Sequence, residues 1–107
     1  EWARLSGAVV ALEAEAMVSS KGAQALLKQL PSPTAQFLAI SLRDPDLRQK
    51  AQDWRAEVEA ALAARRGGGT KGREAAALIF AAWQGRQIWE PAGGKAFRLA
   101  DLLKAMP

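Results

Sequence analysis

The chain has 107 residues, a length typical of one folded domain with one core. Hydrophobic residues make up 50% of it and are mostly Ala and Leu, which favours helices and argues against a sheet or disorder. The chain has no Cys and no His, which excludes thiol nucleophiles, disulfides, imidazole bases and the usual zinc sites. We therefore expect a single all-α domain over residues 1–107, with five to six helices and no cofactor.

The charge pattern and the lengths of the apolar runs indicate whether the chain binds nucleic acid or a membrane. Fifteen basic residues are interleaved with eleven acidic ones, so the net charge of +4 is typical of solvated helix faces and not of a nucleic-acid surface. Nothing approaches the run of about 18 apolar residues that spans a bilayer, and no apolar stretch has signal-peptide flanks. We expect a cytoplasmic protein without membrane contact. Because the chain opens at Glu1 without Met, it is interpreted as part of a longer protein or a trimmed chain.

Three helices are expected in the first part of the chain. Apolar residues spaced by three and four predict the first helix over 2–18, and a short second helix is predicted over 23–30. A turn rich in proline follows. Ser32 is expected to cap the third helix, which runs over 33–42 with Pro33 at its first position.

The clearest helix boundary in the sequence lies after the third helix. Asp44 is expected to cap a long fourth helix that begins at Pro45 and runs to about Arg66. Gly67 suits the left-handed position beyond its end. Thr70 is then expected to cap a fifth helix.

The fifth helix, predicted over 72–90 and stopped by Pro91, has an unusual pattern. Residues 75–83 are all apolar, so at about 100° per residue they cover the whole circumference of the helix. The fifth helix and a sixth helix predicted over 95–106 form an αα-hairpin. This hairpin has more apolar surface than monomers usually expose to water. We expect a second copy to complete a four-helix bundle, although a tightly packed monomer is an alternative. The expected dimer interface is Leu78, Ala82, Gly85, Trp89, Leu99, Leu102, Leu103 and Met106.

A second set of residues is a candidate lining for an apolar small-molecule pocket, because such pockets are mostly hydrophobic with a few polar groups. Its members are Trp2, Leu5, Val9, Phe37, Ser41, Trp54, Val58, Phe80 and Trp83. Ser6, Glu13 and Gln84 are further polar candidates. For each aromatic residue, ordinary core packing is the competing and stronger interpretation.

No motif indicates catalysis. Glu13 and Glu15 are two residues apart on a helix and point to different sides, so they cannot act together on one substrate. The glycine-rich stretch 67–72 lacks the Ser or Thr after its lysine that a phosphate-binding loop requires. We expect a protein that is not an enzyme.

Three segments together resemble the C-terminal domain of the tetracycline-repressor (TetR) family of bacterial transcription regulators. They are the Arg-Asp-Pro break within 37–48, the Ala-rich run over 75–85 that ends on Gly, and the short last helix over 99–106. The resemblance implies a homodimer built by the last two helices and an effector pocket in the preceding ones. The helix-turn-helix of that family is missing from this chain, so DNA contact is expected only through a domain not present here.

Two other functions remain open at this stage. One is a helical protein-interaction module that offers its apolar hairpin to a different protein. The other is a small basic nucleic-acid-binding module centred on residues 65–73.

Overall fold

A computed structural model describes residues 1–14, 20–93 and 97–105. These residues form six α-helices and one 3₁₀ turn: α1 (Trp2–Ala14), α2 (Ser20–Gln29), α3 (Ala35–Arg43), α4 (Pro45–Arg65), α5 (Gly69–Trp89), η1 (Glu90–Ala92) and α6 (Leu99–Ala105). The described segments contain no strand, which confirms the predicted all-α class. The radius of gyration is 13.6 Å, close to the value of about 13 Å expected for a folded chain of this size.

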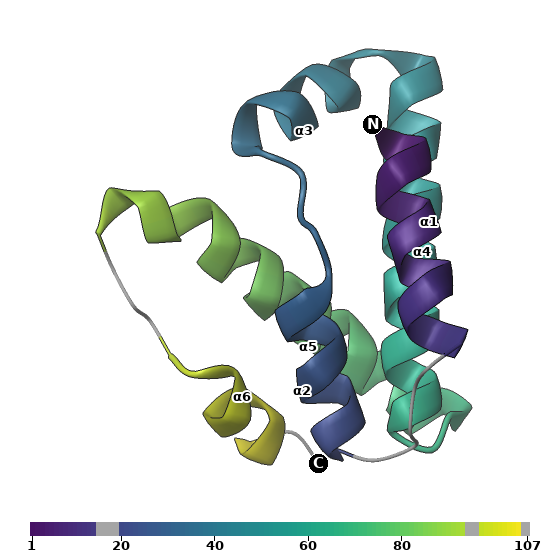
Figure 1. The fold of residues 1–107 in the computed structure, drawn as a ribbon, viewed down its shortest axis with the longest axis vertical. Coiled ribbons are helices and arrows are strands. Elements are labelled where there is room, and N and C mark those ends of the chain that lie inside the picture. Colours follow the sequence, from purple (N-terminus) through teal and green to yellow (C-terminus); the bar gives the residue numbers. More distant parts are fainter. Residues whose placement is uncertain (15–19, 94–96, 106–107) are drawn as a thin grey trace.

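The long helix α4 is the axis of the fold (Figure 1). It packs against α1, α2, α3 and α5, with its most extensive contacts to α5. In Figure 1, α1 runs beside α4, α3 leans over the top, and α5 crosses below α3. The short helix α6 lies beside α2, which is its main neighbour.

The core forms where the apolar faces of these helices meet. On α4, Trp54, Val58 and Leu62 follow one another at intervals of four and are at most 2% exposed. On α1, Leu5 and Val9 form the same kind of stripe. Because four-residue spacing places side chains one above another on a helix, each helix presents a continuous apolar ridge to its neighbours.

The boundary between α3 and α4 is as predicted. Asp44 Oδ1 accepts hydrogen bonds from the backbone N–H groups of Asp46 and Leu47, at 2.9 and 3.1 Å. Pro45 takes the first helical position, where the missing N–H costs nothing. After α4, Gly67 has a φ of +89°, the left-handed conformation expected beyond a helix end.

Two predicted caps were wrong. Helix α3 begins at Ala35, after the prolines, and its cap is Thr34, whose Oγ1 accepts the Phe37 N–H at 3.1 Å. The Ser32 hydroxyl instead accepts a hydrogen bond from the Gln84 side chain, 52 residues further along the sequence. Helix α5 begins three residues earlier than predicted, at Gly69, so Thr70 lies inside its first turn.

The C-terminal ends predicted for the second to fifth helices agree with the structure to within one residue, but α2 begins at Ser20, three residues before its predicted start at 23. Residues 15–18 of the predicted first helix, and 95, 96 and 106 of the predicted sixth, lie outside the described residues. Phe97 and Arg98 precede α6 without helical structure, so that helix starts later than predicted, at Leu99. No helix within the described residues is both long and apolar enough to cross a lipid bilayer.

Candidate functional site

The aromatic residues predicted to line a pocket form one connected cluster in the core. Trp54 is its centre: its ring lies 5.7 Å from Trp2, 5.6 Å from Phe80 and 6.3 Å from Trp83. Phe37 joins at the edge, 5.2 Å from Trp2. These tilted and edge-on separations are typical of stabilising aromatic pairs. Most of this set therefore serves as core, which is the stronger of the two interpretations of the sequence.

A buried hydrogen bond fixes one end of the cluster. Trp2 Nε1 donates to Ser41 Oγ over 3.0 Å, and Ser41 is fully buried. The bond joins α1 to α3 across 39 residues of sequence and satisfies both polar groups. Ser41 therefore has a structural partner and does not face an open cavity.

An open cleft lies between α3, α4 and α5, with a volume of about 270 Å³. It is lined by Leu38, Leu42, Ala51, Gln52, Trp54, Arg55, Phe80 and Gln84. Of the nine predicted pocket residues, only Trp54 and Phe80 line it. Leu5, Val9 and Val58 are buried in the core and do not line the cleft. The volume is near the lower end of the range for small-molecule sites.

Two of the three polar side chains that line the cleft have defined partners. The Arg55 guanidinium stands over the Phe80 ring, 5.3 Å from its centre, and pairs with Glu59 at 3.5 Å. Gln84 Nε2 donates to Ser32 Oγ at 2.9 Å. These side chains present hydrogen-bond donors and suit a ligand with an oxygen acceptor. Within the described ranges, no three acidic, His or Cys side chains gather as a metal site would require.

Two buried indole N–H groups lack an acceptor among the residues that the structure describes. Trp54 Nε1 and Trp83 Nε1 are both shielded from solvent, and neither donates a hydrogen bond to any described residue. A buried unpaired donor costs about 1–3 kcal/mol. Trp54 also lines the cleft, and Trp83 lies next to Trp54 in the aromatic cluster, so one of these two unpaired donors lies at the cleft and the other beside it.

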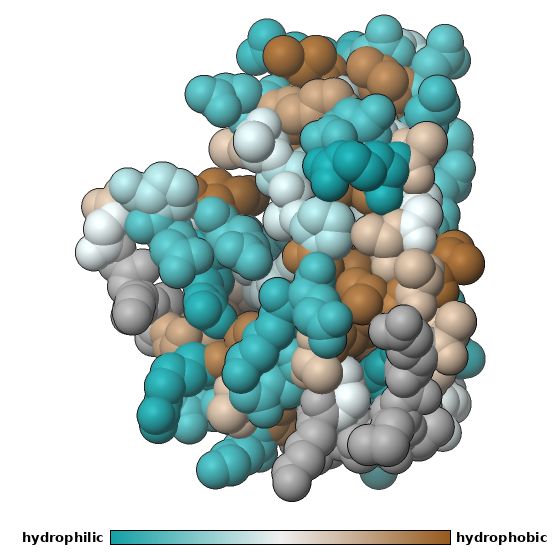
Figure 2. All heavy atoms as spheres, in the orientation of Figure 1, coloured by the Kyte–Doolittle hydropathy of each residue, from teal (hydrophilic) through white to brown (hydrophobic). Residues whose placement is uncertain are grey.

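The sequence analysis missed the outer walls of the cleft. Leu38 and Leu42 come from α3, and Gln52 and Arg55 come from the outer side of α4. Leu42 and its neighbour Ile40 are 49% and 61% exposed, and apolar side chains are visible on α3 at the top of Figure 2. The sequence signal that could have identified this wall is the pair of apolar residues, Ile40 and Leu42, directly before the Arg-Asp-Pro break.

The other remaining predicted polar residues lie elsewhere. Ser6 Oγ donates to Glu57 Oε1 at 3.4 Å, on the far side of α4 from the cleft lining. Glu13 is exposed on α1 and lies near the buried guanidinium of Arg65. Neither contributes to the cleft between α3, α4 and α5.

The predicted dimer residues on α5 form an outward-facing stripe, called here the outer face of α5. Leu78 is 59% exposed and Trp89 is 72% exposed, with the half-buried Ala82 and Gly85 between them. Ala81 and Ile88 are exposed on the same side. The opposite side of the helix, with Ile79, Phe80 and Trp83, is buried. The surplus apolar surface inferred from the nine-residue run is therefore real and lies on one side.

The predicted dimer residues on α6 differ from those on α5. Leu99 and Leu103 are 8% and 5% exposed and belong to the chain's own core, and Leu102 packs against it. Helix α6 contacts α2 more than α5, so its apolar face is already covered within the chain. This corrects the expectation that both C-terminal helices supply interface area. Met106 lies outside the described residues.

Comparisons of the chain with protein-family models, with curated proteins and with solved structures found no match.

Proposed function

We propose that this chain is the effector-sensing and dimerisation part of a TetR-like transcription regulator of the repressor type. Its role is regulatory and not enzymatic, and it reaches DNA only through a separate domain. The sequence resemblance supports the family. The outer face of α5 is the observation that carries the proposal, because this face needs a partner and borders the cleft.

The outer face of α5 has the composition of a helix interface. Between Ala75 and Gly85 the sequence contains no charged residue, and small side chains occupy the centre of the exposed side. Two helices with Ala and Gly at their crossing point can approach closely. The larger Leu78 and Trp89 lie towards the two ends and extend the contact.

This face is complementary to a second copy of itself. If two α5 helices cross antiparallel midway between Ala82 and Gly85, Ala82 of one copy lies opposite Gly85 of the other, and Leu78 lies opposite Trp89. The same contacts then repeat across the two-fold axis, as a dimer interface of this symmetry requires. A chain with a net charge of +4 repels its copies, so an uncharged face is where contact costs least.

The cleft and the dimer face share one helix. Phe80 and Gln84 of α5 face the cleft, while the adjacent Ala81 and Gly85 face outward. A ligand that moves α5 relative to α3 therefore also changes the geometry of the dimer. We propose an apolar effector with one hydrogen-bond acceptor, because the cleft is mainly apolar and its polar side chains offer donors.

The dimer is tested by its oligomeric state. Gly85 has open space where a side chain would stand, so Gly85→Leu is compatible with the fold but blocks close helix approach. Gly7 on α1 has the same open surroundings, which makes Gly7→Leu a matched control. In sedimentation equilibrium at micromolar concentration we expect a dimer for the parent chain and Gly7→Leu. We expect at least about tenfold weaker association for Gly85→Leu. A monomeric parent chain, or equal association in both variants, would contradict the proposal.

The cleft is tested with 1-naphthol, a neutral apolar probe that carries one hydroxyl group. Leu42→Trp adds bulk at the cleft wall, whereas Ile40→Trp adds the same side chain to α3 outside the lining residues. We expect the probe to shift the Trp54 indole signal in ¹⁵N NMR spectra of the parent chain. Leu42→Trp should weaken binding about tenfold and Ile40→Trp should not. An unshifted Trp54 signal, or equal binding in both variants, counts against a ligand role for the cleft.

A further inference from the structure

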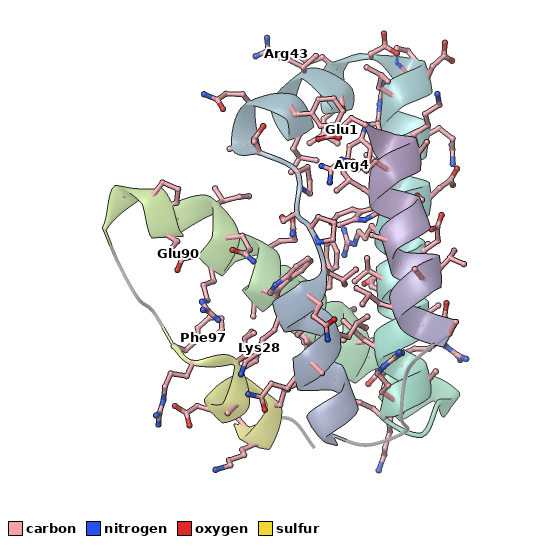
Figure 3. All side chains as sticks on the ribbon, viewed as in Figure 1. Glu1, Arg4, Lys28, Arg43, Glu90 and Phe97 are labelled. Carbon is pink, nitrogen blue, oxygen red and sulfur yellow. The ribbon has the colours of Figure 1, made fainter. Side chains whose placement is uncertain are left out.

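A second hollow, called here the basic groove, lies between α2, the C-terminal half of α5 and the start of α6. Its volume is about 570 Å³, about twice that of the cleft. Lys28 from α2, Arg86 from α5, and Phe97 and Arg98 before α6 line it. Figure 3 shows Lys28 and Phe97 beside one another at the place where α2 and α6 meet. The groove shares no residue with the cleft or with the outer face of α5.

Positive charge dominates the basic groove. Three cationic side chains line it against one carboxylate, Asp101, which Arg98 already engages at 3.0 Å. Lys28 and Arg86 have no ion pair within 4 Å in the described part of the chain, although Glu90 lies one turn after Arg86. Two cations in one concave site therefore lack a counter-charge among the described residues. Such a site concentrates anions.

The groove also offers an apolar surface. The Arg86 guanidinium lies 5.8 Å from the centre of the Phe97 ring, a cation–π contact that restrains both groups. The guanidinium fork can bind a carboxylate or phosphate through two parallel hydrogen bonds, and Lys28 supplies a further point charge. The half-buried Phe97 provides a surface for a ring. A charged group and a ring are thus recognised side by side.

We infer that the basic groove binds a small organic anion, with a carboxylate or phosphate held by Lys28 and Arg86 and an aromatic body against Phe97. A small molecule is favoured over a polymer because the cations sit in a hollow of ligand size and not along an extended stripe. This site stands independently of the proposed regulator function, since neither dimerisation nor the cleft enters the argument.

The inference is tested by ¹⁵N NMR titration with four probes: phenyl phosphate, benzoate, inorganic phosphate and benzyl alcohol. We expect phenyl phosphate or benzoate to give saturable shifts at the amides of Lys28 and of residues 98–101, and the tighter of the two identifies the preferred head group. Inorganic phosphate should bind at least about tenfold more weakly because it lacks the ring. Neutral benzyl alcohol should give no saturable shift. If neither aromatic anion saturates, or if the shifts lie elsewhere, the inference is overturned.

Charge-removing variants locate the site. Lys28→Gln and Arg86→Gln should each weaken binding of the tighter anion about tenfold. Lys71→Gln removes an equal charge from the exposed start of α5, outside the groove, and should leave binding unchanged. Lys28 is exposed and Arg86 half-buried, and circular dichroism confirms that each variant folds. Equal binding in the Lys28→Gln/Arg86→Gln double variant, or equal weakening in Lys71→Gln, would exclude this site.

Discussion

Trp2 and Ser41 are held together by a fully buried hydrogen bond, with the indole N–H donating to the hydroxyl over 3.0 Å. Trp2 lies on α1 and Ser41 lies on α3, and both helices contact α4. Each of the two helices also contributes an aromatic ring to the cluster, Trp2 from α1 and Phe37 from α3. This bond is the direct polar link between α1 and α3 among the described residues. It sets the position of α3, and therefore of one wall of the cleft.

Ser41→Ala should lower the free energy of unfolding by about 1–3 kcal/mol. The variant removes the acceptor and leaves the Trp2 N–H buried without a partner. Urea denaturation at neutral pH measures the loss. Ser6→Ala is the control, because its bond to Glu57 is long, at 3.4 Å, and only partly buried; its loss should stay within about 0.5 kcal/mol. Equal losses in the two variants would show that the Trp2–Ser41 bond adds nothing specific.

Trp2→Phe should destabilise the protein by about 1–2 kcal/mol more than Trp83→Phe. Both substitutions remove the same atoms from a buried site, but Trp83 Nε1 has no acceptor among the described residues, so losing it relieves an unsatisfied donor. Trp2→Phe instead breaks a bond and orphans the Ser41 hydroxyl. The difference between the two denaturant midpoints is the measurement. A larger loss for Trp83→Phe would mean that ring packing outweighs the hydrogen bond.

Arg65→Met should raise the free energy of unfolding by about 1 kcal/mol. Arg65 is 5% exposed and its Nη1 donates to the Ala61 carbonyl at 2.7 Å, but Nε and Nη2 have no partner in the described structure. Burial lowers the pKa of the Arg65 guanidinium, and the charge of Glu13 opposes that shift. Methionine keeps the apolar stem and removes the desolvated charge.

The pH dependence of that gain follows from the lowered pKa. Between the folded and the ordinary pKa of Arg65, the unfolded chain binds more protons, so stability rises with pH there. At neutral pH the group is charged in both states, and the full cost of burial is present. The gain from Arg65→Met should therefore be constant from mildly acidic to mildly basic pH. Arg48→Met, at an exposed position, is the control and should stay within about 0.5 kcal/mol.

Asp44→Ala should cost about 1 kcal/mol of stability, because its carboxylate caps two backbone N–H groups at the start of α4. Asp44→Asn retains an oxygen acceptor and should restore most of the loss. Thermal unfolding of the two variants separates the cap from a general charge effect. If the Asn variant is as unstable as the Ala variant, the negative charge at the helix start matters and the cap does not.

The parts of this fold that depend on local chemistry were predictable from the sequence. Asp44 and Pro45 form a two-residue signal for a helix start that does not depend on the rest of the chain, and they lie where predicted. The cap of α3 was misplaced because Ser32 and Thr34 are both competent caps, and the tertiary bond from Gln84 occupies Ser32. A single sequence does not contain that choice.

The site was less predictable, because it depends on which helices meet. Periodicity identified Leu99 and Leu103 as one apolar face but not α2 as the helix that covers it. Similarly, the aromatic residues were identified as a group, yet only Trp54 and Phe80 among them reach the cleft. The walls come from residues on α3 and α4 whose role appears only after the helices pack.

Three of the four tryptophan side chains are buried in the core, and one is exposed to solvent. Trp2, Trp54 and Trp83 are at most 5% exposed, whereas Trp89 stands out from the end of α5 at 72%. A soluble quencher such as iodide should therefore extinguish the fluorescence of one tryptophan and spare the rest. Trp89 lies on the outer face of α5, so covering that face would protect the accessible emission, and iodide quenching would report the proposed self-association without any added label.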